Sequence, residues 1–427
     1  MIGIIQDSLS DWAEQASQMA DIFSNAHLTI AANASQNGQQ GLLNRHHKAR
    51  YFETTHDGTA FSVCIRDSVH HEFVHNILGT LSGHSDLPLR KRAWCFQEEL
   101  LSTRVIHFTG DEIQFVCRAA TICECYPEWQ DRFESPFTED GTGFPALDWG
   151  HFIKHYTARQ ITFPGDRLPA LSSFTHAFQE GPDRYHAGLW ESHMPGSLLW
   201  WSQCGKRPEQ ERNSQSRPPS WSWASIEGQA NYSEATSTQD IAEVLDVCTY
   251  SCTTDPRGVV SGGQITLRAP LFSLRGMWKN DKNPWEDFLR LASGDSSFDP
   301  CFSCSPDWAT DRQWLEEDGC YCVLDDSAHP LLLPENSGIN TPIFLLIIHR
   351  LEQDVWWAKK LPYPGGYRFL GLLLQPLEDL SQTQMKAMED SESKLSFVRI
   401  GFGGICLSKE DGEEALNRFG NTTITIF

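Results

Sequence analysis

The chain has 427 residues, of which 40% are hydrophobic and 11% aromatic, a composition that excludes wholesale disorder and allows about two or three domains. Acidic side chains outnumber basic ones by 56 to 34, and the formal net charge of -22 argues against nucleic acid as a partner because it repels phosphate backbones. No run of about 18 apolar residues is present, so the sequence predicts no membrane span. The 13 cysteines, an odd number, are typical of reduced thiols, and we expect a cytoplasmic protein.

The first elements predicted along the chain are a helix and a strand. Apolar residues within Asp11–Phe23 recur at the spacing of one helical face, and acidic residues at its start can form a capping box. A short strand is expected over Leu28–Ala32. The polar, histidine-rich stretch of about residues 44–88 is typical of an irregular insertion, with one strand predicted at Ala60–Arg66.

The segment Arg90–Cys117 carries the most consistent local signals of the chain. A basic stretch leads into a helix-forming run at Cys95–Leu101. Two runs of apolar and β-branched residues follow, Thr103–Phe108 and Glu112–Cys117, with Thr-Gly-Asp between them. The segment therefore predicts a helix followed by a strand, a turn and a second strand.

The remainder of the chain divides into a helical and a β-rich part. An acidic linker at Glu134–Gly143 precedes helical patterns around Phe152–Gln160 and Leu168–Glu180. The alternation of large and small residues in Trp221–Ser225 suits a strand, and its two tryptophans would then share a face, either as a platform for a ligand or, as we favour, as buried packing.

Short strand-like runs separated by Pro, Gly and Asp turns dominate from Ile241 onward. They are Glu243–Tyr250, Gln264–Ala269, Cys320–Leu324, Ile343–Leu351, Arg368–Leu374, Leu395–Phe402 and Thr422–Phe427. We therefore predict an α+β protein with two regions. These are residues 1–133, and residues 144–427 with a helical part over about 150–205 and a β-rich part over about 218–427.

Two stretches resemble signature blocks of a known family. The sequence of Arg92–Arg104 is similar to the third block of the fungal heterokaryon-incompatibility (HET) domain family. It reads Arg-Ala-Trp-x-x-Gln-Glu, followed by Leu-Leu-Ser-x-Arg after one further residue. The stretch Ile4–Ala32, with its Gln6-Asp7 pair, is similar to the middle block. The first block of the family is missing, and Gly3 stands where its cysteine would be. The resemblance thus implies a domain that lacks its N-terminal part.

The resemblance also implies a fold and a role. The HET family is regarded as a distant relative of TIR domains, so residues 1–133 are expected to form an incomplete α/β, TIR-like domain. The implied role is self/non-self recognition and programmed cell death in fungi, as an effector or interaction module with protein partners or through self-association. No cofactor is required for that role. Some TIR domains hydrolyse NAD with one glutamate, and if this activity extends here, NAD is a substrate and Glu14 the candidate catalytic residue. The other interpretation of Glu14 is a helix-capping carboxylate.

The motif residues implied by the family admit two interpretations. They are Gln6, Asp7, Arg92, Trp94, Gln97 and Glu98. In a functional interpretation, Arg92 contacts an anion in a cleft and Glu98 orients it. In the structural interpretation, which we favour, Trp94 fills the core, Arg92 pairs with Glu98, and Gln97 satisfies backbone groups.

Two further patterns suggest metal sites. His71-Glu72-Phe73-Val74-His75 matches the HExxH pattern of zinc metalloproteases, a remote alternative because no clear amphipathic helix surrounds it. Four thiols, Cys301, Cys304, Cys320 and Cys322, lie near the spacing of a structural zinc site, although the second pair is one residue short. Isolated reduced cysteines are the ordinary interpretation.

Overall fold

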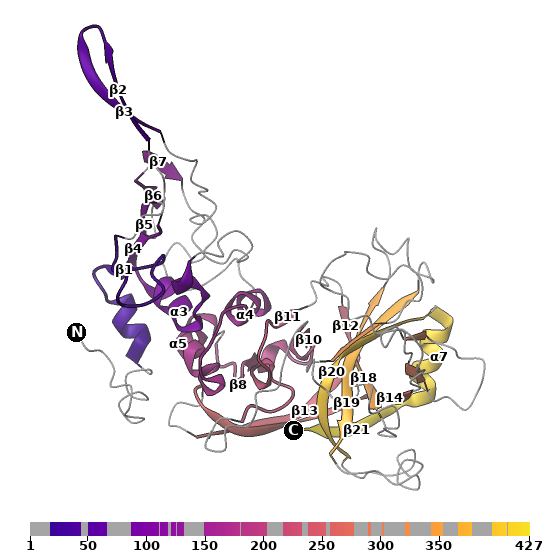
Figure 1. Ribbon diagram of the computed structural model, residues 1–427. Helices are drawn as coiled ribbons and strands as arrows, with labels where there is room; N and C mark the ends of the chain where they lie inside the picture. Colours follow the sequence, from indigo (N-terminus) through magenta and orange to yellow (C-terminus); the bar gives the residue numbers. More distant parts are fainter. Residues whose placement is uncertain are drawn as a thin grey trace, which may run out of the picture. The chain divides into compact units, whose positions relative to one another are not determined.

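A computed structural model of the chain describes residues 18–43, 50–65, 87–110, 112–117, 121–124, 126–131, 149–179, 181–202, 217–232, 238–252, 257–276, 289–291, 301–302, 321–324, 343–352, 366–377, 395–407 and 409–427. It divides the chain into two compact units (Figure 1). The first unit comprises Met1–Phe163 with Pro169–Gln179, and the second comprises Pro164–Leu168 with Glu180–Phe427. Helices and strands occur in both, so the chain is α+β, as predicted.

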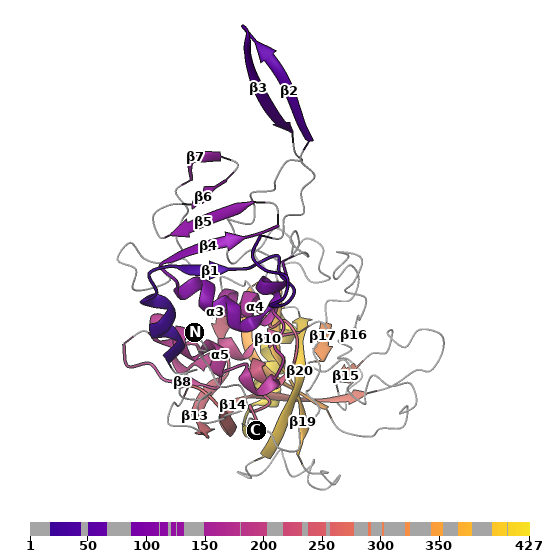
Figure 2. The ribbon, with the colours of Figure 1, turned by 60° about the vertical axis from the view of Figure 1, so that its left-hand side comes forward.

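The first unit contains a five-stranded sheet, visible as a ladder in Figure 2. Its order is β1 (Thr29–Ala31), β4 (Arg104–Phe108), β5 (Ile113–Cys117), β6 (Thr121–Cys123) and β7 (Tyr126–Asp131). Strand β1 pairs with β4 in parallel, and the later pairs are antiparallel. The strands predicted around β1, β4 and β5 are confirmed. Residues 18–24 are helical, which confirms the C-terminal part of the predicted first helix, Asp11–Phe23.

Three helices of the first unit share an aromatic core. They are α3 (Ala93–Leu101), α4 (Trp149–Thr157) and α5 (Pro169–Phe178), with the short 3-10 helix η1 (Pro88–Lys91) before α3. The Phe96 ring centroid lies 5.1 Å from that of Phe152 and 6.1 Å from that of Phe174. All three rings are fully buried. Because such packing buries apolar area, it holds α3 against α4 and α5. The three predicted helices are confirmed.

Residues 50–65 form a β-hairpin rather than the irregular segment that we predicted. Strand β2 (Arg50–His56) pairs along its whole length with β3 (Thr59–Ile65) as a separate two-stranded sheet. The turn places Asp57 at φ 48° and Gly58 at φ 79°, the two positive values that a tight Asp-Gly hairpin turn requires. Only β3 was predicted. Strand β2 was missed, although the Asp57-Gly58 pair is a sequence signal for a hairpin turn between two strands.

The second unit is dominated by a ten-stranded sheet. Its strands are β12 (Thr238–Asp240), β13 (Glu243–Ser251), β14 (Val260–Gly276), β15 (Leu289–Leu291), β16 (Cys301–Phe302), β17 (Tyr321–Leu324), β18 (Ile343–Glu352), β19 (Tyr367–Pro376), β20 (Leu395–Leu407) and β21 (Asn421–Ile426). Strands β14, β18, β19, β20 and β21 each pair with the next, and β21 pairs with β14, so these five strands close into a ring. Closure removes free strand edges. Helix α7 (Lys409–Phe419) connects β20 to β21, and every strand predicted after Ile241 is confirmed.

The predicted helical part ends earlier than expected. After α5, the chain forms the hairpin of β8 (Tyr185–His186) and β9 (Leu189–Trp190), and later the pair of β10 (Trp200–Trp201) and β11 (Asn231–Tyr232). The turn between β8 and β9 places Ala187 at φ 47° and Gly188 at φ 101°, a geometry incompatible with a helix. The short 3-10 helices η2 (Pro164–Asp166), η3 (Glu191–His193) and η4 (Gly196–Leu198) complete this part.

The predicted strand over Trp221–Ser225 is wrong. Residues Trp223–Ser225 form the 3-10 helix η5, because the Ser222 side chain accepts a hydrogen bond from the Ala224 amide and caps the turn. Both Trp221 and Trp223 are fully buried, so the interpretation of these tryptophans as packing residues is confirmed. The Trp223 indole N–H donates to the Gly188 carbonyl, 2.9 Å away.

Candidate functional site

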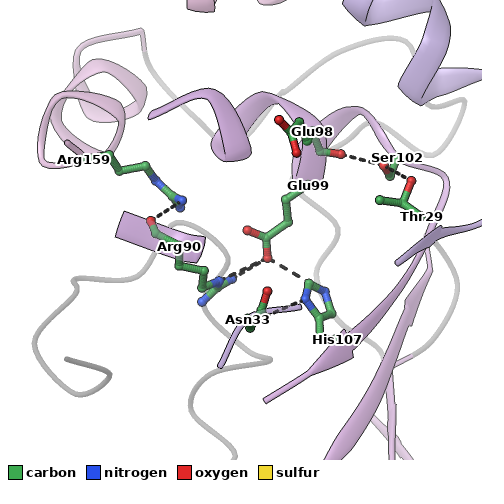
Figure 3. A network of polar contacts seen from close by, with 8 residues as sticks. All are labelled: Thr29, Asn33, Arg90, Glu98, Glu99, Ser102, His107 and Arg159. Atoms are coloured by element: carbon green, nitrogen blue, oxygen red, sulfur yellow. Dashed lines mark hydrogen bonds and ion pairs between the residues drawn. The ribbon is translucent and has the colours of Figure 1, made fainter. Parts of the chain in front are cut away.

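A buried ion pair joins η1 to the motif helix α3. The extended Arg92 backbone separates the two helices, so that the side chains of Arg90 and Glu99 can meet although they lie nine residues apart. Nη2 and Nε of Arg90 donate to Glu99 Oε1 over 2.6 and 3.2 Å (Figure 3). Each side chain is only 9% exposed. Such a desolvated, charge-assisted pair is held rigidly when both groups are satisfied.

His107 and Asn33 extend this pair into the sheet. His107 lies on β4 opposite Ala31, and Asn33 follows the end of β1. The Asn33 amide donates to His107 Nδ1 over 3.0 Å, so Nδ1 is the acceptor and the ring proton sits on Nε2. Nε2 points to Glu99 Oε1, 3.9 Å away, as Figure 3 shows.

Arg159 closes the cluster from the end of α4. Its Nη1 donates to the backbone carbonyl of Arg90 over 2.7 Å, and its guanidinium carbon lies 4.4 Å from the centre of the Phe96 ring. The neighbouring backbone is bound on both sides, since the Ala93 amide donates to Gln160 O and the Gln160 amide donates to Lys91 O. We call Arg90, Glu99, His107, Asn33 and Arg159 the Arg90 network.

The charges of the Arg90 network follow from its burial and from its ion pair. Burial alone would raise the pKa of Glu99, but Arg90, and then His107 and Arg159, lower that pKa by more, so Glu99 is a carboxylate. Burial lowers the pKa of His107 to about 4, despite the opposing effect of Glu99, so the ring is neutral at pH 7. Burial likewise lowers the pKa of Arg159 to about 10, at which the guanidinium stays charged.

The family-motif residues lie beside this network rather than in it. Arg92 is exposed, Trp94 and Glu98 are half-buried, and Gln97 is fully buried. Phe96, not Trp94, fills the core. Arg90 forms its ion pair with Glu99, while the charge of Arg92 acts on the carboxyl of Glu98, the partner that we predicted for it. The reason is helical geometry, which turns Glu99 toward η1 and leaves Arg92 in solvent at the helix start.

Glu98 nevertheless has an anchoring role through its backbone. The Ser102 hydroxyl donates to the Glu98 carbonyl over 2.6 Å and lies 2.7 Å from the Thr29 hydroxyl of β1 (Figure 3). Burial raises the pKa of the Glu98 carboxyl, while the nearby Arg92 lowers it by less. Helix α3 is thus tied to β1 at its C-terminal end and to β4 through His107.

Other predicted site residues lie outside the described residues. They are Gln6, Asp7, Glu14, His71–His75, Cys304 and Cys320. Cys301 lies in β16 and Cys322 in β17, and these two strands pair with other strands and not with each other. No group of three or more metal-ligating side chains occurs among the residues that the structure describes. The zinc sites and the role of Glu14 remain predictions.

Arg90, Glu99, His107 and Asn33 were missed as site residues. A signal for Arg90 and Glu99 exists, since a basic residue just before a helix and a carboxylate in its last turn suggest a pair. His107 and Asn33 have no such signal, because they lie 74 positions apart in the sequence and their proximity depends on the parallel pairing of β1 with β4. Chemically, the network holds a buried carboxylate in its charged form beside a neutral imidazole, which orders the end of β1 and the motif helix.

Comparison with known protein families gives one match, which covers the N-terminal part of the chain. The family model described as Heterokaryon incompatibility protein (HET) matches residues 1–98, a span that ends within α3. No curated protein and no solved structure matches the chain. Among the described helices, none has the length and apolar character needed to cross a membrane. Residues 1–98 are therefore similar to the HET family, in agreement with the resemblance that the sequence indicated.

Proposed function

We propose that this chain is a heterokaryon-incompatibility-type protein that acts in self/non-self recognition and programmed cell death. The observation that carries the proposal is the HET family match over residues 1–98, together with the buried Arg90 network at its C-terminal end. The network fixes the motif helix α3 to the sheet. The motif residues Arg92, Trp94 and Glu98 then stay partly accessible on a rigid support, which suits contact with a partner.

The hairpin of β2 and β3 supports a role as an interaction module. One face of the hairpin carries Phe52, Phe61, Val63 and Ile65, since Phe52 lies opposite Val63 and the other two lie two positions from Val63 on the same strand. Their exposed fractions run from 37% for Val63 to 55% for Ile65. Apolar side chains gathered on an exposed face are a common mark of protein recognition. We propose protein partners or self-association on this basis.

Expression in a filamentous fungus tests the proposal. Inducible production of the full chain is expected to arrest growth, and Trp94→Ala and Glu98→Gln are expected to restore it. Glu53→Gln, which changes an exposed carboxylate on the hairpin face opposite to Phe52, Phe61, Val63 and Ile65, is the matched control and should still arrest growth. Immunoblots establish equal protein levels. Healthy growth at high expression of the parent chain would contradict the proposal.

A second proposal is hydrolysis of NAD by a TIR-like scaffold with Glu14 as the catalytic residue. The parallel pairing of β1 with β4, with α3 before β4, favours it, since α/β sheets bind ligands where parallel strands end. The purified chain is then expected to release nicotinamide from NAD, and Glu14→Ala to abolish the release while Glu53→Gln preserves it. Equal release by parent and Glu14→Ala would refute the assignment.

A further inference from the structure

Helix α4 carries two histidines on adjacent turns of one face. His151 is exposed and His155 half-buried, and their Nε2 atoms lie 3.0 Å apart. The ring centroids are 4.6 Å apart, with an angle of 62° between the planes. Residues four apart are neighbours on a helix surface, so the backbone of α4 itself holds the two rings together.

The distance between the two nitrogens matches that of two ligands on one metal ion. With bonds of about 2.0 to 2.1 Å, two imidazole nitrogens are separated by about 3.3 Å at a tetrahedral angle and by about 2.9 Å at a right angle. The observed 3.0 Å falls between these values. The spacing of the two nitrogens therefore fits an ion bound by both rings.

The protonation of the pair also suits a metal ion. Without an ion, one ring donates its Nε2 proton to the other. When an ion binds both Nε2 atoms, the donor ring carries its proton on Nδ1 instead, so both rings stay neutral and no proton is released. Besides His151, the basic groups that act on His155 are Lys154 and Arg159.

The surrounding charges do not prevent cation binding. Of the two basic groups that act on His155, Arg159 directs its guanidinium to the Arg90 carbonyl and the Phe96 ring. Lys154 has a long, flexible side chain that can turn its ammonium into water. The formal charge of the whole chain is -22, which attracts cations in general.

We propose that His151 and His155 form a two-histidine chelate for a late first-row divalent metal ion, with water in the remaining coordination positions. Imidazole suits Zn²⁺, Cu²⁺ and Ni²⁺, and two ligands on one helix favour no single one of them. The ion would link two turns of α4. Because Phe152 and Tyr156 of the same helix pack on Phe96, the link also stabilises the support of the motif helix α3.

Calorimetric titration of the full chain with Ni²⁺ tests this site, since Ni²⁺ prefers imidazole and thiols compete less for it than for softer ions. A binding step is expected in the parent, with a Kd at least tenfold higher in His151→Ala and in His155→Gln. His27→Asn, which removes an exposed histidine elsewhere in the first unit, should leave the step unchanged.

Thermal unfolding provides a second measurement. Ni²⁺ is expected to raise the melting temperature of the first unit in the parent and in His27→Asn, but not in His151→Ala, because an ion that binds only the folded state stabilises it. Circular dichroism without metal establishes that each variant folds. Equal Ni²⁺ affinity in parent and His151→Ala, or an equal metal-induced shift in both, would overturn the proposal.

Discussion

Each of the two units buries an arginine, and they do so in different ways. In the first unit, Arg90 pairs with the Glu99 carboxylate beside the neutral His107. In the second, the fully buried Arg399 of β20 donates to the backbone carbonyls of Leu198, over 2.5 Å, and Trp200. Its guanidinium carbon also lies 3.5 Å from the centre of the Trp200 ring. The partner of Arg90 is thus a charged carboxylate, whereas the partners of Arg399 are neutral.

This difference determines how each unit responds to its surroundings. A carboxylate and an imidazole gain or lose protons within the ordinary pH range, whereas carbonyls and an indole do not. The stability of the first unit should therefore depend on pH through Glu99 and His107 of the Arg90 network. The surroundings of Arg399 in the second unit instead rely on hydrogen-bond geometry and on close packing of Trp200, Trp221 and Trp223, all fully buried. Unfolding should be followed as two transitions, one for each unit.

The largest expected effect is that of Glu99→Ala. Loss of this carboxylate leaves Arg90 buried without its charged partner, and the free energy of unfolding of the first unit should fall by about 4 kcal/mol. Urea unfolding followed by circular dichroism measures the change. Glu98→Ala, at the adjacent and more exposed position, is the control and should cost less than about 1 kcal/mol. Equal losses would show that the Arg90 network contributes no special stability.

Arg399→Leu should affect the second unit almost as strongly. The substitution removes the donors to the Leu198 and Trp200 carbonyls and leaves these acceptors in a buried, apolar site, at a cost of about 3 kcal/mol. Urea unfolding should show the loss in the transition of the second unit alone. Unlike the loss in Glu99→Ala, it should be the same at pH 5 and pH 7. A pH-dependent loss would break the distinction between the two units.

Acidification should weaken the first unit through His107. Its pKa is lowered to about 4 in the folded state from about 6.5 in an unfolded chain, so the unfolded chain binds more protons between these values. The contribution of His107 to stability is then fully present above pH 6.5. As the pH falls toward 4, the free energy of unfolding of the first unit decreases by at most about 3 kcal/mol. Glu99, whose pKa is also lowered, adds to the loss at still lower pH.

Urea unfolding at a series of pH values measures this dependence. His107→Gln should flatten the curve between pH 4 and pH 6.5, while His27→Gln should leave it as in the parent. The half-buried His155, whose pKa is lowered to about 4 as well, contributes to the same window in every variant. An unchanged curve in His107→Gln would show that the network does not carry the pH dependence.

The smallest expected effect concerns the close packing of the second unit. A Cβ at Gly188 would lie 2.5 Å from the Trp223 indole nitrogen, and the residue has φ 101°, so Gly188→Ala should cost about 2 kcal/mol. Gly181→Ala is the matched control, because Gly181 also has a positive φ, of 58°, but open space around its Cβ. Its cost should be about 1 kcal/mol. Thermal unfolding of both variants measures the two costs, and their difference is the cost of the contact between the new Cβ and Trp223.

Local signals predicted most of the elements but not all. Helix α3 and strands β4 and β5 were predicted because hydrophobic periodicity and the Thr-Gly-Asp turn agree within one segment. Strand β2 was missed because its residues are all exposed and show no buried alternation, although the Asp57-Gly58 turn marks the hairpin. The 3-10 helix at Trp223 was missed because a side-chain cap by Ser222 overrides the strand-like alternation.

What the sequence by itself determined is the α+β composition, the order of most helices and strands, and the similarity of residues 1–98 to the HET family, since these depend on residues close together in the chain. The tertiary structure alone decided the candidate site. Glu99 meets Arg90 only because Arg92 separates η1 from α3, and His107 meets Asn33 only because β4 lies parallel to β1. The physical reason is that burial and ion pairing depend on distances in space, which periodicity along the chain does not encode.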